Sequence, residues 1–428
     1  MVRLLTTLLF GLTAALSSVD ADAAPLSFES AKAKAGARVA IVGGTVHDGV
    51  GGVIENAVVE MDGARIVRVG TGTPSAGATV VDAKGQWVTP GFIAASTPLG
   101  LVEIDMEGST RDTGRNTDPV RANYDAALAV NASSSLLGVQ MIDGITSAAV
   151  TPQGGLISGQ VAWIDLLPEH HVDIVARRRV AVAGSLGQTY GGSRAAALAR
   201  LAEVLDDARF YRSRKAAYDR RASRDLAAHR LDLEALGPVL GREVPLVLSA
   251  HRASDLLAIV ELAKTQKLRV VIAGGAQAWK VADVLAEAKV PVIVQPSSNL
   301  PGGFDRLGAR MDGAALLHAA GVSVGIAVMG EAHNVRNVSQ EAGIAVAYGL
   351  PAEVALSAVT STLAEAYGMG ADYGVLRAGA VANVVLWPGD PFELSNVPSA
   401  VYIRGEAQTL RSRQTELRDR YLDLDRFQ

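Results

Sequence analysis

Apolar residues follow two different patterns along this chain, and the change between them lies near residue 88. From Arg38 to Val88, short apolar runs alternate with polar residues and end at turn pairs of the types Asp-Gly and Lys-Gly. A period of two that closes at such pairs is typical of strands joined by tight turns. We therefore predict a small β-sheet over residues 37–88.

Between residues 89 and 369, apolar runs of strand length alternate with helical patterns. The runs are rich in valine and isoleucine, and we predict strands at 88–94, 145–150, 180–183, 244–250, 268–273, 290–295 and 322–328. Residues 253–267 and 278–290 instead carry apolar residues at i, i+3, i+4 and i+7. Continuous apolar strands that alternate with helices indicate a parallel sheet covered on both faces. The size of the segment, about 280 residues, favours an α/β fold of the (β/α)8 TIM-type barrel class; an open, doubly wound sheet is the alternative.

The C-terminal part of the chain returns to the strand pattern. Residues 382–390 (ANVVLWPGD) and 400–407 (AVYIRGEA) lie within a segment, 370–410, that is too short to form a core of its own. We expect this segment to complete the N-terminal sheet as a small β-sandwich domain, and residues 411–428 to form a charged helix. The basic stretch 209–230 is interpreted as an exposed helix laced with aspartates, with an anion-binding patch as the alternative.

The first residues have the pattern of an export signal. Arg3 precedes the apolar run 4–16, and Ala21-Asp22-Ala23 matches the small-residue pattern of a cleavage site. An apolar run of about 13 residues falls short of the roughly 20 that span a bilayer. We predict that residues 1–23 are a signal peptide cleaved near Ala23, that the mature protein is periplasmic or secreted, and that it is not held in the membrane.

Composition narrows the possible functions. The chain has 428 residues, 49% of them hydrophobic, no cysteine, and 40 basic against 44 acidic side chains. This apolar content excludes a disordered chain, and the lack of cysteine excludes disulfide scaffolds, cysteine nucleophiles and thiolate metal sites. No excess of positive charge favours nucleic acid or an anionic membrane as a partner.

Three segments carry a resemblance to a known family. They are residues 39–70, residues 82–93 (DAKGQWVTPGFI) and residues 374–391 (GVLRAGAVANVVLWPGDP). In this order they resemble the amidohydrolase superfamily, in particular its imidazolonepropionase-like and dihydroorotase-like branches. The resemblance implies a barrel with one or two divalent ions that activate water for attack on the C–N bond of an amide or cyclic amide.

The family's metal ligands are replaced at the matching positions. Its first barrel strand ends Pro-Gly-Phe-Ile-Asp-x-His-x-His, whereas here Ser96 and Pro98 stand at the two histidine positions. Ser249 stands where the fifth strand carries a histidine, and the sixth strand, 270–275, has none. Proline offers no side-chain donor and a neutral hydroxyl is a weak ligand, so we expect no metal cofactor at this position.

A relocated zinc site is the alternative. His251, Glu331 and His333 all follow predicted strands, where barrel active sites are built, and Glu103 and Asp105 follow the first strand. Glu331 is the carboxylate nearest the position of the family's general base, which makes it the candidate catalytic residue.

Three further residues are candidates for ligand binding. Gln160 ends a glycine-rich segment that faces the barrel mouth in the resembled branch. Arg306 and Arg310 follow the seventh strand and are placed to clamp a ligand carboxylate; pairing with Asp305 or Asp312 is the alternative.

Two functions follow from these residues. In the first, the chain is an exported amidohydrolase-like protein without its metal site, a pseudoenzyme. It then binds either a small amide-like ligand or a partner chain, and the partner is a second copy of itself in a homodimer or an active relative in a heterodimer. In the second, it is an active hydrolase of C–N bonds that uses a relocated ion or none. Metal content and turnover of the purified protein distinguish the two.

Overall fold

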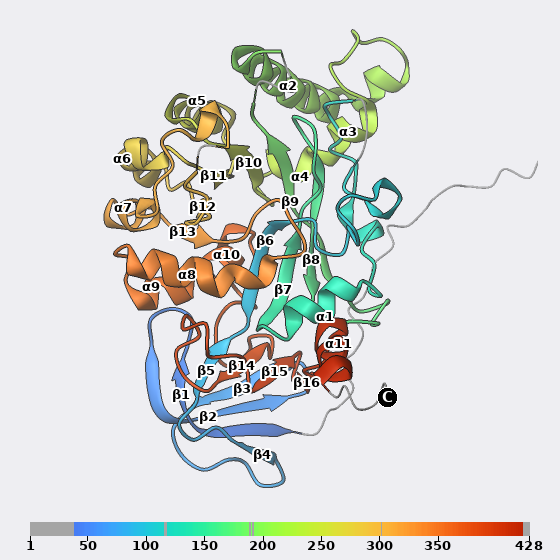
Figure 1. Cartoon of the computed structure of the whole chain (residues 1–428). Helices are drawn as coiled ribbons and strands as arrows, with labels where there is room; N and C mark the ends of the chain where they lie inside the picture. Colours follow the sequence, from blue (N-terminus) through green and yellow to red (C-terminus); the bar gives the residue numbers. More distant parts are fainter. Residues whose placement is uncertain (1–37, 115–117, 188–189, 191, 301, 423–428) are drawn as a thin grey trace, which may run out of the picture. The chain divides into compact units, whose positions relative to one another are not determined.

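An eight-stranded sheet forms the centre of the computed structural model, which describes residues 38–422 except 115–117, 188–189, 191 and 301 (Figure 1). Its strands lie side by side in chain order: β6 (Phe92–Thr97), β7 (Ile145–Val150), β8 (Gly159–Asp165), β9 (Val175–Ser185), β10 (Leu246–Ala250), β11 (Val270–Gly274), β12 (Val292–Val294) and β13 (Val324–Ile326). The predicted signal peptide lies outside the described residues. No described helix is long and apolar enough to cross a membrane.

The sheet curls so that its first and last strands approach each other. The N–H of Gly330, just after β13, donates to the carbonyl of Ser96 in β6 at 2.9 Å. This confirms the predicted barrel fold class, with one correction. Strand β8 runs antiparallel to both of its neighbours, whereas all other neighbouring pairs are parallel. The reversal follows a turn in which Gly154 and Gly155 have φ values of +82° and +105°, which glycine adopts without strain.

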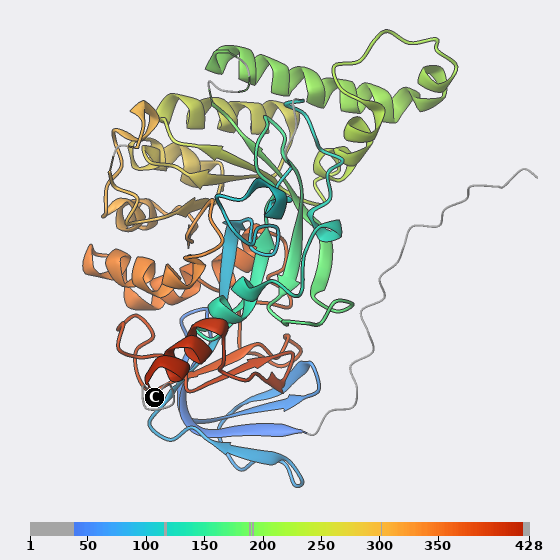
Figure 2. The same ribbon diagram turned by 45° about the vertical axis from the view of Figure 1, so that its right-hand side comes forward.

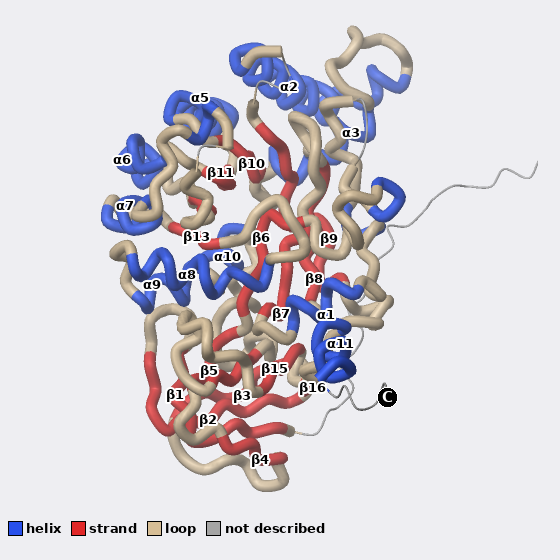
Figure 3. Tube along the Cα trace, viewed as in Figure 1, coloured by secondary structure: helices blue, strands red, loops and turns tan. Residues whose placement is uncertain are grey.

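Helices cover the outer side of β10 to β13 in both ribbon views (Figures 1 and 2) and in the tube coloured by secondary structure (Figure 3). The helices of the chain are α1 (Ser135–Met141), α2 (Arg194–Asp219), α3 (Arg230–Ala235), α4 (Gly237–Leu240), α5 (Ala253–Gln266), α6 (Ala282–Glu287), α7 (Gly313–Ala319), α8 (Val338–Ala347), α9 (Ala352–Ala358), α10 (Ser361–Ala366) and α11 (Arg413–Leu422).

Alternate residues of each parallel strand belong to two different cores. Leu246 and Leu248 of β10 pack with the helices, whereas Val247 between them packs with Val271 and Ile293 of the neighbouring strands. The period of two in a strand places these sets on opposite faces, and both faces are apolar because the sheet is covered outside and filled inside. The barrel interior is therefore a packed core and not an open channel.

A second sheet joins strands from both ends of the chain. It has the order β16-β15-β14-β5-β1-β2-β3, and β4 pairs with β1. Its N-terminal strands are β1 (Val39–His47), β2 (Val53–Asp62), β3 (Arg65–Gly70), β4 (Thr79–Asp82) and β5 (Trp87–Pro90), and its C-terminal strands are β14 (Val384–Trp387), β15 (Ala400–Ile403) and β16 (Glu406–Ala407). The two groups meet where β5 and β14 pair antiparallel, with Trp87 opposite Trp387.

One buried carboxylate links the barrel to this second sheet. Asp165, at the end of β8, is completely buried and accepts hydrogen bonds from Ser147 of β7 at 2.9 Å and from Asn383 at 3.1 Å. Arg404 donates to it at 2.6 Å and the Tyr373 hydroxyl at 3.1 Å. Four partners from separate segments compensate for the desolvation of this charge.

The basic stretch 209–230 forms the end of α2 and the segment after it. Arg209 pairs with Asp206, Lys215 with Glu234 and Arg224 with Asp207, so acidic residues balance three of its basic side chains. The helix prediction is wrong beyond Asp219, where α2 ends, and Asp207 is buried and not exposed.

Candidate functional site

The C-terminal ends of the barrel strands carry neutral side chains at Ser96, Pro98 and Ser249, the residues expected to replace the metal ligands of the resembled family. Ser96 has a left-handed backbone, with φ of +53°, and its Oγ lies 3.2 Å from the hydroxyl of Tyr367. Tyr367 directly follows α10 and is buried, and this burial raises the pKa of its hydroxyl. An aromatic side chain from a distant segment therefore reaches the first ligand position from inside the barrel.

The donor chemistry at this position does not fit a zinc ion. A catalytic zinc takes three protein ligands that are imidazoles, thiolates or carboxylates. Ser96, Pro98 and Ser249 supply none of these groups, and Pro98 is buried. In the described part of the chain, no three His, Asp or Glu side chains lie close enough together to hold one metal ion.

His251 follows β10 and leans against the backbone of β11. A Cβ atom added to Gly274 would lie 2.4 Å from His251 Cε1, so only glycine leaves room for the ring at this position. The pKa of His251 is lowered to about 4, first by burial and then by the nearby guanidinium of Arg306, against a smaller opposing effect of Asp305. The imidazole is therefore neutral near pH 7, where it both donates and accepts one hydrogen bond.

A cavity of about 80 Å³ opens beside this imidazole. Its polar and aromatic lining consists of His251, Trp279, Gln295, Ser298, Arg306 and Arg310. The volume is several times what one water needs, so it suits a small organic molecule.

The two arginines of this cavity differ in their partners. Arg310 donates to both carboxylate oxygens of Asp312, at 2.6 and 2.5 Å, and stacks over Trp279 at 4.8 Å. Asp305 forms an ion pair with Arg194. Arg306 has no ion-pair partner among the residues that the structure describes. Arg306 is therefore the cation in this cavity that is available to an anionic group.

The remaining predicted residues lie elsewhere or are occupied. Glu331 accepts a hydrogen bond from Asn334 at 2.8 Å, and His333 Nδ1 lies 3.2 Å from Asp105 Oδ2. Gln160 is buried in β8 and donates to the carbonyl of Ala122 at 3.0 Å. The structure brings His251, Arg306 and Arg310 together, but it does not gather His251, Glu331 and His333 into one metal-binding group.

Sequence reasoning missed the support of this cavity. Gln295 directly follows β12 and donates to Glu341 of α8 at 3.0 Å, and Glu341 also accepts from the N–H of Ser297 at 2.8 Å. Glu341 is buried, so it fixes both the glutamine and the turn after β12. The only signal in the sequence was that Gln295 ends a predicted strand.

Comparison with known proteins supports the fold. No family model matches the chain. A 75-residue segment, 18% of this chain and 8% of the relative, is 40% identical to amidohydrolase tasK of Hapsidospora irregularis.

An amidohydrolase structure from Thermotoga maritima superposes with a TM-score of 0.79 at 23% identity, over 87% of this chain and all of that chain. A zinc-bound adenosine deaminase from Xanthomonas campestris superposes with a TM-score of 0.52 at 15% identity, over 91% of this chain and 98% of the other. The predicted resemblance to the amidohydrolase superfamily is confirmed, and the structural matches establish a shared fold.

Proposed function

We propose that this chain of the amidohydrolase fold is exported, and that it binds a small, amide-like carboxylate at Arg306 and His251 without a metal ion at the family position. The observation that carries the proposal is the guanidinium of Arg306, which has no partner in the described structure and lines one cavity with the neutral imidazole of His251. A guanidinium binds a carboxylate through two parallel hydrogen bonds. The neutral imidazole and the Ser298 hydroxyl would supply further hydrogen bonds to the amide.

The state of the metal positions supports binding over hydrolysis. Ser96, Pro98 and Ser249 leave the family's water-activating ion without ligands of the required kind. Hydrolysis of C–N bonds remains the second candidate, because the matched structures include hydrolases and because His251 is neutral and able to accept a proton from water.

Calorimetry with matched ligands tests the binding proposal. We expect N-acetylated amino acids to bind and the corresponding primary amides, which lack the carboxylate, to bind at least about tenfold more weakly. Arg306→Gln should abolish this preference, whereas Arg310→Gln should preserve it because Asp312 already occupies Arg310. Equal effects of the two substitutions, or no preference for the carboxylate, would contradict the proposal.

Two further measurements separate the alternatives. Metal analysis after dialysis should give far less than one equivalent of zinc, and amide libraries should show no turnover. One equivalent of zinc that is lost together with turnover in His251→Ala would establish the hydrolase instead. Export predicts that N-terminal sequencing of the mature protein begins near Ala24, and an intact Met1 would exclude processing at this site.

A further inference from the structure

A second cavity lies at the opposite end of the barrel strands. It has a volume of about 530 Å³, well above that of the cavity beside His251. Pro245, Val270, Pro291 and Ser323 line it, and each of them begins or directly precedes one of the strands β10 to β13. The cavity is therefore on the N-terminal face of the barrel, separate from the site at the C-terminal face.

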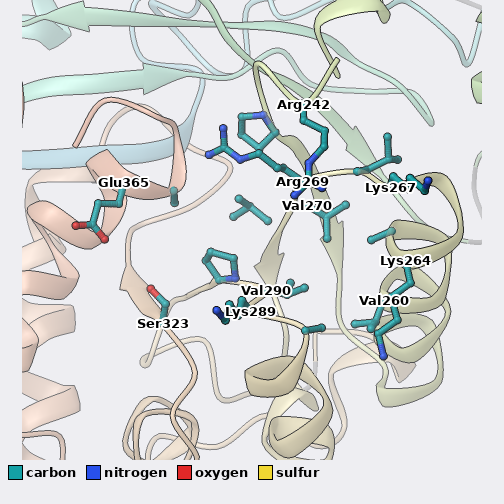
Figure 4. A pocket seen from close by; sticks show the side chains of 17 residues that line it. Arg242, Val260, Lys264, Lys267, Arg269, Val270, Lys289, Val290, Ser323 and Glu365 are labelled. Carbon is teal, nitrogen blue, oxygen red and sulfur yellow. The ribbon is translucent and has the colours of Figure 1, made fainter. Parts of the chain in front are cut away.

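Basic side chains dominate the rim of this cavity. Arg242, Lys264, Lys267, Arg269 and Lys289 line it together with one carboxylate, Glu365. Figure 4 shows Glu365 across the hollow from Lys264 and Lys267. In the described part of the chain, none of the five cations has an ion-pair partner, although the whole chain has more acidic than basic residues. Five uncompensated charges around one concave surface concentrate a positive potential there.

The backbone at three of these cations is unusual for such side chains. Arg242, Lys267 and Lys289 follow helices α4, α5 and α6 and have left-handed φ values of 61°, 53° and 51°. Glycine is the usual residue at this place, and Gly321 has it in the next loop, with φ of +85°. The left-handed conformation costs other residues roughly 1–2 kcal/mol, so the fold carries these cations where an uncharged glycine would be more stable.

The helix dipole explains only part of this arrangement. A cation near a helix C-terminus is favourable, and Lys264 in the last turn of α5 already meets that requirement. Arg269 lies immediately before β11, after the helix has ended, and yet it lines the same cavity. The charges therefore converge on the cavity and not on the individual helix ends.

We propose that this cavity binds a small multivalent phosphate anion of the pyrophosphate or phosphorylated-metabolite type. Arg242 and Arg269 offer planar guanidinium groups for paired hydrogen bonds to phosphate oxygens, and Lys267 and Lys289 act as point charges. The Ser323 hydroxyl is a further donor on the rim. Apolar walls from Val260, Leu268 and Val290 exclude water from one side, which strengthens these charge interactions.

Calorimetric titration of the purified full chain with inorganic pyrophosphate tests the proposal. We expect one binding site that weakens as salt rises from about 50 mM, because the charges are solvent-facing. The triple variant Arg242→Gln, Arg269→Gln, Lys289→Gln should bind at least about tenfold more weakly. The matched variant Lys84→Gln, Arg212→Gln, Arg230→Gln removes the same charge from exposed positions elsewhere and should bind within about twofold of the parent.

Glu365→Gln tests the same cavity in the opposite direction and does not depend on the triple variant being folded. Removing the one carboxylate of the rim should tighten pyrophosphate binding by about two- to fivefold. No binding at about 1 mM pyrophosphate, or equal losses in the two triple variants, would overturn the proposal.

Phosphatidylglycerol vesicles distinguish a free phosphate from a lipid headgroup. The proposal expects that these vesicles do not retain the protein. If they retain the parent but not the cavity variant, while pyrophosphate does not bind, the ligand is a membrane surface and the small-anion proposal is wrong.

Discussion

The two ends of the barrel strands differ in how far their charges are paired. At the C-terminal end, Ser96, Pro98 and Ser249 are neutral and Arg310 and Asp305 are both paired. Arg306 is the one cation of the cavity at this end without an ion-pair partner among the described residues. At the N-terminal end, below β10 to β13, five cations surround a larger cavity without partners in the described structure. Barrel enzymes concentrate their chemistry at the C-terminal face. In the described part of this chain, the N-terminal face has more unpaired cations around its cavity than the C-terminal face, so a search confined to the C-terminal face would miss it.

Restoring the metal ligands should change the C-terminal end most. The variant Ser96→His, Pro98→His, Ser249→His, combined with Tyr367→Phe to remove the hydroxyl beside Ser96, should bind one zinc ion. We expect a dissociation constant of micromolar or below, which corresponds to about 8 kcal/mol, where the parent binds none. Calorimetry with zinc measures this gain. Absence of zinc binding in a folded variant would mean that these positions do not converge and that the mouth never had the family geometry.

Removal of Asp165 tests how much its buried ion pair stabilises the N-terminal end of the barrel, where the second sheet covers it. Asp165→Ala leaves Arg404 without its buried partner, and we expect a loss of about 3–5 kcal/mol in the free energy of unfolding. Urea denaturation measures the loss. Asp372→Asn is the control, because its pair with Arg65 is about half exposed and should contribute less than about 1 kcal/mol. Similar losses in the two variants would show that the buried pair of Asp165 stabilises the fold no more than the half-exposed pair of Asp372.

The pH dependence of stability tests the neutrality of the C-terminal mouth. His251 has a pKa lowered to about 4 in the folded chain, while in the unfolded chain it titrates near 6.5. As pH falls from 6.5 to 4, the unfolded state takes up a proton that the folded state does not, so stability falls over this range. The full difference is about 3 kcal/mol at most.

Urea unfolding of the parent and of His251→Gln at two pH values measures this contribution. The first, pH 7.5, lies roughly one unit above the range, and the second, pH 4.5, lies near its lower end. The variant should lose less stability than the parent on acidification. His318→Gln, at an exposed helix position, should not change the slope, and an unchanged slope in His251→Gln would refute the assignment.

The smallest effect is expected at the left-handed positions of the N-terminal cavity. Lys267→Gly and Lys289→Gly should each raise the free energy of unfolding by less than about 1 kcal/mol, because relief of the left-handed strain is partly offset by the entropy of glycine. Both variants should bind pyrophosphate more weakly. The reverse change, Gly321→Lys, should lower stability by about 1 kcal/mol. A loss of stability in both glycine variants would contradict the strain argument.

The parallel half of the barrel was accessible from sequence because its signal is local. Strands β10 to β13 are short valine- and isoleucine-rich runs between helical patterns. Three of them fall within a predicted strand, and β11 ends one residue beyond its prediction. Strand β8 was missed because it follows a chain reversal at Gly154 and Gly155, which the glycine-rich sequence suggested was only a tight turn. The predicted helix over 278–290 is shorter, with α6 spanning Ala282–Glu287 after a 3-10 turn.

The two candidate sites also differ in how far their residues could be recognised from the sequence. His251 and Arg306 could be found because each follows a predicted strand, where barrel sites lie. Tyr367 could not be found from sequence, because it lies 271 residues after Ser96 and meets it only in the folded chain. The basic cavity was also hidden. A lysine or arginine near the end of a helix or the start of a strand is ordinary in a sequence, and only the three-dimensional arrangement brings five of them around one cavity.

The pairing of β5 with β14 sets an order of events during synthesis. Trp87 emerges from the ribosome long before its partner Trp387, a delay of roughly 15–60 s at ordinary translation rates. Throughout that interval one edge of β5 has no partner from its own chain, and free strand edges are sites of aggregation. Truncation before Val384 would leave that edge of β5 without the strand that covers it in the complete chain.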